Sequence, residues 1–294
     1  GYRLGEDEQD RKRDYKMIFS TYFIYFIIAS FFGWVWESFY MTIKDHEWSN
    51  RGFLFGPVIP IYGAGTIGIV MVSKLLPGMG KVDYPAWKIF LVAMIGSVVL
   101  EYATSYIMEK MFHAVWWDYS EFKFNLNGRI CLWASLSFGV LGIFVMKVIY
   151  PVMLSFQGKS DPLRNEAVSL VLMLFFGGDL ALSVASIEAV SIRVKRITEN
   201  VNNQMDKLVE KLDETSAKEL KERIMNSAIM TMITESSTAQ RLAFHRVKRT
   251  KFSGDTSEAG ERYLARLKKY KPFELMDKFM HKGSEEEDNN NIKK

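Results

Sequence analysis

The sequence predicts an all-α membrane protein, a polytopic helix bundle followed by a long helical, partly coiled-coil soluble tail. Three observations support this prediction. About five apolar segments, each near the ~20 residues that a spanning helix needs, follow one another between residues 17 and 190. Residues 191–294 are instead rich in charged and polar side chains. Where the two parts meet, apolar residues recur with the seven-residue period of a coiled coil.

Composition excludes several functional classes. The formal net charge of +4 over 294 residues is too small to argue for nucleic-acid binding. The single cysteine, Cys131, excludes an internal disulfide framework and a cysteine-based metal cluster. Because it lies in an apolar run, we interpret it as a packed small hydrophobic residue.

The membrane part follows a polar N-terminal segment, residues 1–16. We assign residues 17–190 to a transmembrane domain with apolar segments near 17–41, 54–76, 87–108, 129–151 and 167–190. The second segment carries Gly56, Pro57 and Pro60 in its first half, which disfavours a regular helix there. A broken or re-entrant helix is therefore an alternative to a full span, since irregular backbone at membrane depth survives where protein covers it.

Charge gives two conflicting cues about orientation. Lysines and arginines in residues 1–16 and in the loops at 77–87 and 152–166 predict an N-terminus inside the cell. Five crossings would then place the tail outside, although the tail begins with Arg193, Lys195 and Arg196. We predict an integral membrane protein of the plasma membrane with a cytoplasmic tail.

The tail predicts two helices and a basic end. The heptad positions Ile187, Val194 and Val201 indicate that the last span continues to about residue 214, and a second helix begins near Thr215. We divide the tail into a helical region, 191–252, and a region at 253–294. The latter comprises a polar linker at 253–260, a basic amphipathic segment at 261–282 and a disordered end. The heptads suggest a homodimer, although Gln204 falls at a core position.

Three carboxylates within the apolar segments are the first candidate ligand-binding residues. Glu37, Glu101 and Asp179 each cost about 2.5–3.5 kcal/mol at membrane depth, so such residues are usually retained for a reason. They form a polar binding site at the bundle centre or, alternatively, pair with arginines and fix helix packing.

The loop at 111–129 and the loop that holds Arg51 supply the other candidates. His113, Asp118, Asn127 and Arg129 are interleaved with aromatic residues that suit a membrane–water interface. By counting crossings, we expect this loop on the same side as Arg51. The two arginines then present bidentate donors to an anionic ligand, or the loops simply pair with each other.

We find no catalytic, metal or cofactor motif. The chain has no HExxH sequence, and no G-x-S-x-G sequence. Gly158-Lys159-Ser160 resembles the end of a phosphate-binding loop, but Met153 replaces its first glycine. We expect no intrinsic ATPase, and the absence of these motifs favours a role other than enzyme.

Four sequence blocks resemble a known family: FFGWVWES, NRGFLFGPVIPIYGAG, LEYATSYIMEKMFHAVWWDYS and NLNGRICL. Over residues 18–150 the chain is similar to the Putative ABC-transporter type IV family, also called CmpB-like permeases. The resemblance implies a multi-pass membrane subunit that works with a separate nucleotide-binding subunit. The matching residues include Glu37, Arg51, Tyr62, Glu101, Asp118, Tyr119, Asn127, Gly128 and Arg129.

The function predicted from these observations is that of a permease-like or ligand-binding membrane subunit with a polar intramembrane or interfacial site. Two alternatives remain open. One is a membrane sensor or scaffold that signals through its helical tail. The other is a membrane-embedded enzyme that acts on lipid-linked substrates, with His113, Asp118 and the arginines at headgroup level.

Overall fold

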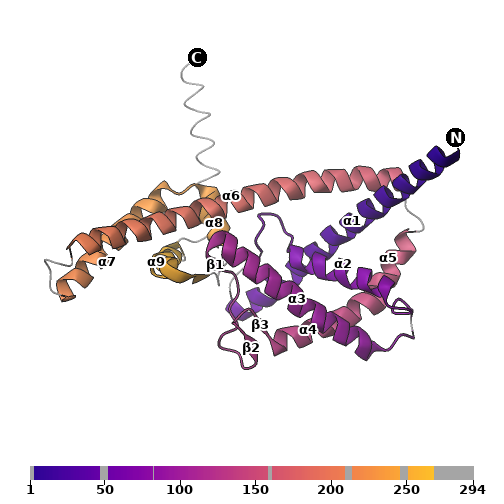
Figure 1. Cartoon of the computed structure of the whole chain (residues 1–294), viewed down its shortest axis with the longest axis horizontal. Coiled ribbons are helices and arrows are strands. Elements are labelled where there is room, and N and C mark those ends of the chain that lie inside the picture. The colour runs from indigo at the N-terminus through magenta and orange to yellow at the C-terminus, as the bar shows by residue number, and fades with distance from the viewer. Residues whose placement is uncertain are drawn as a thin grey trace, which may run out of the picture. The chain divides into compact units, whose positions relative to one another are not determined.

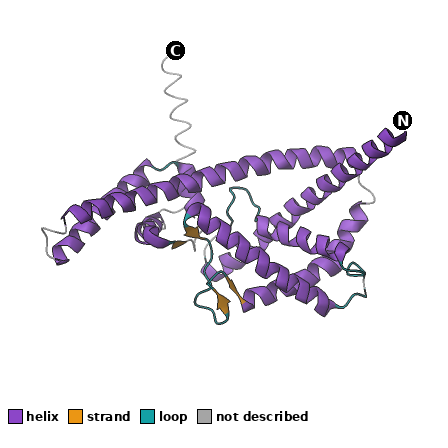
Figure 2. Cartoon of the chain, in the orientation of Figure 1, coloured by secondary structure: helices purple, strands orange, loops and turns teal. Residues whose placement is uncertain are grey.

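The computed structural model describes residues 3–46, 52–81, 83–157, 161–208, 214–245 and 251–267. The chain forms two compact units. Unit 1 comprises residues 1–106 and 118–182, and unit 2 comprises residues 107–117 and 183–294. Helices dominate the described residues, and the strands are only two residues long (Figure 2).

The long apolar helices confirm an all-α membrane bundle. Among the described residues, four helical stretches are long and apolar enough to cross a membrane: Phe19–Lys44 in α1 (Arg3–Asp45), α3 (Ala86–Phe112), Leu132–Phe156, and Pro162–Asp206 in α6 (Pro162–Leu208). Large apolar side chains on these helices face outwards, as with Leu174, 74% exposed, and Phe175, 71% exposed. Such a surface is stable in lipid rather than in water.

The second apolar segment is broken, as its glycines and prolines indicate. Residues Gly52–Ile59 are not helical, and α2 (Pro60–Leu75) is only 16 residues long. At 1.5 Å per residue, α2 spans about 24 Å, less than a typical hydrocarbon core. The Ile59 N–H donates to the carbonyl oxygen of Ser30 in α1 at 3.0 Å, so this irregular backbone is partly satisfied by the neighbouring helix.

Small residues allow α2 to lie directly against α1 (Figure 1). A Cβ atom on Gly63 would overlap Ser30 Oγ and would lie 2.5 Å from the carbonyl oxygen of Phe26. A Cβ atom on Gly33 would lie 2.6 Å from Cβ of Tyr62. Close approach through glycine and serine is the usual way in which membrane helices pack, because lipid supplies no hydrophobic drive between them.

The helical stretch that begins at Leu132 consists of three segments. These are α4 (Leu132–Phe144), the π-helical turn η1 (Val145–Ile149) and α5 (Tyr150–Gln157). The turn places Val145 and Met146 in a buried cluster with Ile69 and Val70 of α2. It also brings the Lys147 Nζ to 2.8 Å from the carbonyl oxygen of Tyr84, to which it donates.

A short hairpin precedes α4. Strands β2 (Asn125–Leu126) and β3 (Ile130–Cys131) are antiparallel, with Asn125 opposite Cys131. The turn between them uses Asn127 at φ 53° and Gly128 at φ 67°, left-handed conformations that these two residue types tolerate best. Cys131 is buried, as expected of a packed small hydrophobic residue.

The first and last spans run in the same direction. The Asn165 side chain, near the start of α6, donates to the Thr21 hydroxyl of α1 at 3.4 Å. Further along both helices, the Phe176 ring contacts the rings of Phe23 and Phe26. The predicted intracellular N-terminus and the predicted cytoplasmic tail are therefore incompatible, because parallel first and last spans require an odd number of crossings.

The described part of unit 2 comprises the end of α3, the second half of α6, four further helical segments and one strand pair. The segments are β1 (Ala114–Val115), α7 (Glu214–Glu235), α8 (Thr238–His245), β4 (Lys251–Phe252), the 3₁₀ turn η3 (Gly254–Thr256) and α9 (Ser257–Leu267). Strands β1 and β4 are antiparallel, with Ala114 opposite Phe252. Helix α9 occupies part of the predicted linker at 253–260, so the linker is shorter than predicted. Most of the predicted amphipathic segment at 261–282 lies outside the described residues.

The heptad face of α6 is covered within a single chain. Ile187, Val190, Val194 and Val201 are each at most 2% exposed. The buried face of α7 includes Met225, Ile229, Met232 and Ile233. Helix α9 buries Tyr263, Leu264 and Leu267. The apolar repeat thus builds the core of unit 2, and it does not require a second chain to cover it.

Candidate functional site

Acidic and tyrosine side chains from three helices form the centre of the candidate site in unit 1. The Tyr62 hydroxyl of α2 donates a hydrogen bond to the Glu37 carboxylate of α1. Glu101 of α3 and Tyr119 of the following loop lie within electrostatic range of the same phenol. Glu37 and Glu101, 64 positions apart in sequence, thus belong to one cluster around Tyr62.

Glu101 is the most deeply buried member of this cluster. Its side chain is 5% exposed, and its Oε2 atom has no hydrogen-bond partner among the described residues. A buried polar atom without a partner is uncommon in proteins, and often marks the place of a water, an ion or a functional group. At membrane depth this arrangement favours a binding role over simple helix packing.

Arg129 and Asn127 attach the hairpin to α3 beside Glu101. The Arg129 Nη1 donates to the Ser105 hydroxyl at 3.1 Å, and its guanidinium carbon lies 5.6 Å from the ring centroids of both Tyr102 and Tyr106. The Asn127 amide donates to the Tyr102 hydroxyl at 3.2 Å. Since Ser105 is one helical turn from Glu101, these contacts position the loop over the acidic cluster.

Asp118 fixes the conformation of the same loop. Its Oδ1 accepts hydrogen bonds from the Ser120 N–H, at 2.9 Å, and from the Ser120 hydroxyl. A Cβ atom on Gly128 would lie 2.8 Å from that oxygen, so glycine is needed there. The Tyr119 N–H donates to the Gly128 carbonyl oxygen at 2.8 Å, which holds Tyr119 in place.

Asp179 of α6 anchors the irregular segment before α2. Its Oδ1 accepts the Phe55 N–H at 2.7 Å, and its Oδ2 accepts the Gly56 N–H at 2.6 Å. A Cβ atom on Gly56 would lie 2.8 Å from Oδ2, so the glycine allows this approach. The carboxylate thus satisfies two backbone donors that lipid could not satisfy.

The remaining two predicted residues are not part of this arrangement. His113 belongs to unit 2, where it ends α3 at φ 52° and its carbonyl oxygen accepts the Ser253 N–H at 2.9 Å. Arg51 lies outside the described residues. The fold therefore brings together Glu37 and Glu101, while Asn127 and Arg129 of the hairpin contact the helix that carries Glu101.

Two residues of the cluster were missed as site candidates. Tyr62 and Tyr119 occur in the resembling sequence blocks, and that was the available signal, but a tyrosine near a bilayer is more often an interface anchor. Among the described residues, no group of three or more His, Cys, Asp or Glu side chains is arranged to hold a metal ion. The two carboxylates and the tyrosine hydroxyls of the cluster can all accept hydrogen bonds, which suits a cationic or hydrogen-bond-donating ligand.

Comparison with known proteins identifies the family of this chain. The family model described as "Putative ABC-transporter type IV" matches residues 24–184, more than half of the chain. The match includes Glu37, Tyr62, Glu101, Tyr119, Arg129 and Asp179. Neither the curated proteins nor the solved structures gave a match. The chain is therefore a member of the Putative ABC-transporter type IV family.

Proposed function

We propose that the protein is a permease-like, ligand-binding membrane subunit whose polar site is built by Glu37, Tyr62 and Glu101. The observation that carries the proposal is the buried Glu101 carboxylate, with an oxygen that has no described partner, in a cluster shared by three apolar helices. Family membership and the long apolar helices support a role in membrane transport. The carboxylates favour a ligand with a positive charge or hydrogen-bond donors.

We expect Glu101→Gln to abolish retention of this ligand while leaving the protein folded. The amide has nearly the shape of the carboxylate but lacks its charge, and a charge-assisted hydrogen bond contributes roughly tenfold or more to affinity. The measurement is mass spectrometry of small molecules that co-purify with the protein in mild detergent, compared between the wild type and the variant.

Glu121→Gln is the matched control, since Glu121 is exposed in the loop of the same unit. It should retain the ligand as the wild type does. A Glu101→Gln protein that folds and still carries the same ligand at the same occupancy would contradict the proposal. A variant that fails to insert or fold would instead support a packing role for Glu101.

The partner we propose is a separate nucleotide-binding subunit, because we found no ATPase motif in the sequence. A nucleotide-binding protein that co-purifies in near-equal amount supports this assembly.

The alternative of a membrane sensor is favoured by one observation: α6 is continuous over 47 residues, so the helix that holds Asp179 also contributes to the core of unit 2. Co-purification of a regulatory protein in place of an ATPase would favour the sensor.

We further propose that the protein lies in the plasma membrane with residues 191–294 in the cytoplasm, since Arg193, Lys195 and Arg196 follow the last apolar stretch. Lysines at the end of unit 1 away from the tail, such as Lys74 and Lys88, favour the opposite orientation, with the tail outside the cell. In a Cys131→Ser background, a cysteine at the exposed Ser227 should be protected from an impermeant maleimide in intact cells. Labelling without permeabilisation would reverse the orientation.

A further inference from the structure

Two arginines of unit 2 bury part of their charge without a partner. Arg193 on α6 and Arg241 on α8 each have one buried guanidinium nitrogen, Nη1 and Nε, with no hydrogen-bond acceptor among the described residues. The Nη2 of Arg241 donates to the Thr234 carbonyl oxygen at 3.2 Å, which orients that group. Buried charged donors are normally paired, so each of these nitrogens needs an explanation.

Neither arginine has an acid one helical turn away on its own helix. The positions three and four residues away on the same helix, where an ion pair would form, hold no Asp or Glu. They are Ala189, Val190, Arg196 and Ile197 around Arg193, and Ser237, Thr238, Phe244 and His245 around Arg241.

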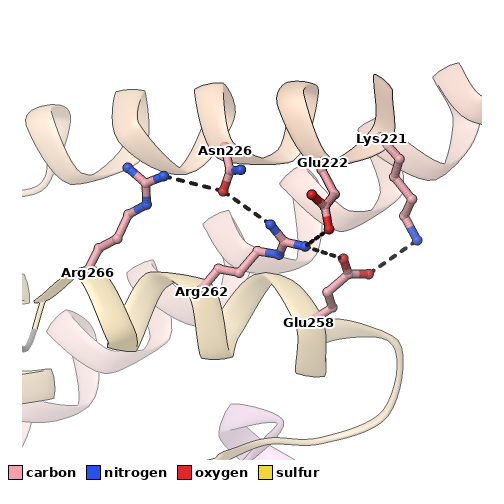
Figure 3. Close-up of polar contacts among 6 residues, drawn as sticks. All are labelled: Lys221, Glu222, Asn226, Glu258, Arg262 and Arg266. Atoms are coloured by element: carbon pink, nitrogen blue, oxygen red, sulfur yellow. Dashed lines mark hydrogen bonds and ion pairs between the residues drawn. The ribbon is translucent and has the colours of Figure 1, made fainter. Parts of the chain in front are cut away.

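The ion-pair network around Arg262, a partly exposed arginine of the same unit, gives a direct contrast (Figure 3). Arg262 of α9 contacts Glu258 at 3.2 Å and Glu222 of α7 at 3.4 Å, and its Nη1 donates to Asn226 at 3.2 Å. Lys221 pairs with the other oxygen of Glu258 at 3.2 Å. Here the positive charges are matched with acids, whereas among the described residues neither Arg193 nor Arg241 forms an ion pair with an acid.

Both guanidinium groups lie within electrostatic range of one buried hydroxyl, that of Tyr263 on α9. Burial raises the pKa of Tyr263 to about 12, and the nearby Ser236 hydroxyl and the positive charges of Arg241 and Arg193 oppose this rise. The two arginines, 48 positions apart in sequence, therefore both lie within electrostatic range of the Tyr263 hydroxyl in unit 2. Like charges in one region repel each other, and an anion beside them relieves that repulsion.

We propose that Arg193 and Arg241 form a binding site for a phosphate group. A phosphate offers several acceptor oxygens and matches the planar fork of a guanidinium in a bidentate manner, and two arginines would compensate its double charge. Both side chains remain partly exposed, so the group can enter from solvent. The phosphate belongs either to a lipid headgroup or to a free anion, since Arg193 closely follows the last apolar stretch.

The test uses the full-length protein, purified in neutral detergent without phosphate. Thermal unfolding is measured with inorganic phosphate and, at matched ionic strength, with sodium chloride. Phosphate should raise the unfolding temperature of the wild type in a saturable way. Arg193→Met and Arg241→Met should each weaken the apparent phosphate affinity by roughly tenfold or more. Arg223→Met, an exposed arginine on α7, should respond as the wild type.

A second arm distinguishes the source of the phosphate. The protein is reconstituted in nanodiscs with phosphatidylglycerol or with phosphatidylcholine, and native mass spectrometry counts the phosphatidylglycerol molecules that remain bound after extraction. Retention by the wild type and loss in Arg193→Met identify a lipid headgroup, whereas a response to inorganic phosphate alone identifies a free anion.

Two outcomes would overturn the proposal. One is a wild type that neither responds to phosphate nor retains phosphatidylglycerol. The other is an Arg193→Met or Arg241→Met protein that responds as the wild type does. If a methionine variant does not fold, the corresponding lysine variant is used, since Arg193→Lys keeps the charge but loses the fork. Unchanged phosphate affinity in the folded lysine variants would also contradict a bidentate site.

Discussion

Replacing Gly63 by alanine is expected to prevent α2 from packing against α1. The added Cβ would overlap the Ser30 hydroxyl and would lie 2.5 Å from the carbonyl oxygen of Phe26, which is backbone and cannot move without distorting α1. Inserting even one carbon into a packed contact typically costs about 1–3 kcal/mol, and a clash with helix backbone lies at or above the upper end. We expect a much lower unfolding temperature in detergent and a poor yield of inserted protein.

Gly68 provides the control on the same helix. A Cβ atom on Gly68 would meet nothing within 4 Å, so Gly68→Ala tests the effect of alanine in α2 without the clash. Alanine is the better helix former by about 1 kcal/mol, so this variant should be as stable as the wild type or slightly more stable. Equal stability of the Gly63 and Gly68 variants would disprove the close contact between α1 and α2.

Removing the Asp179 carboxylate is expected to release the irregular segment at residues 52–59. In Asp179→Ala the N–H groups of Phe55 and Gly56 lose their acceptors, at 2.7 and 2.6 Å, in a partly buried segment that joins two apolar helices. Each buried donor left unsatisfied costs about 1–3 kcal/mol, so the loss should approach several kcal/mol. Asp179→Asn keeps one acceptor and should have a smaller effect.

Hydrogen–deuterium exchange separates a local effect from a global one. We expect the amides of residues 52–59 to exchange much faster in Asp179→Ala, with a smaller change in α3. Glu166→Ala, at a partly exposed acid on the same helix, is the control and should leave exchange in this segment unchanged. Wild-type protection of residues 52–59 in Asp179→Ala would show that another group holds the segment.

The carboxylates illustrate how far residue type predicts role. The rarity of an acid at membrane depth identified Glu37, Glu101 and Asp179 as a set, but it gave them one common role. The structure separates them: Glu37 and Glu101 gather around Tyr62, whereas Asp179 accepts two backbone N–H groups. The residue type predicts that burying the charge is costly. Which group compensates that cost depends on which helices become neighbours.

The tail shows the same division for apolar residues. The period of Ile187, Val194 and Val201 correctly predicted a helix that continues beyond the last apolar segment, and it also suggested a dimer. The structure buries this stripe within one chain, together with Met225, Ile229 and Tyr263. A heptad pattern indicates that one face of a helix must be covered, but it does not indicate whether the same chain or a second chain covers it.

The sequence by itself therefore determined the elements that depend on local chemistry. These are the long apolar helices, the break before Pro60, the continuous α6 and membership in the family. Only the tertiary structure decided the pairs that lie far apart in the chain, such as Asp179 with Gly56 and Arg193 with Arg241 beside Tyr263. The physical reason is that helix formation and membrane insertion depend on length and hydropathy within one segment. Which side chains meet depends on how several segments pack, and glycines such as Gly63 set how closely they approach.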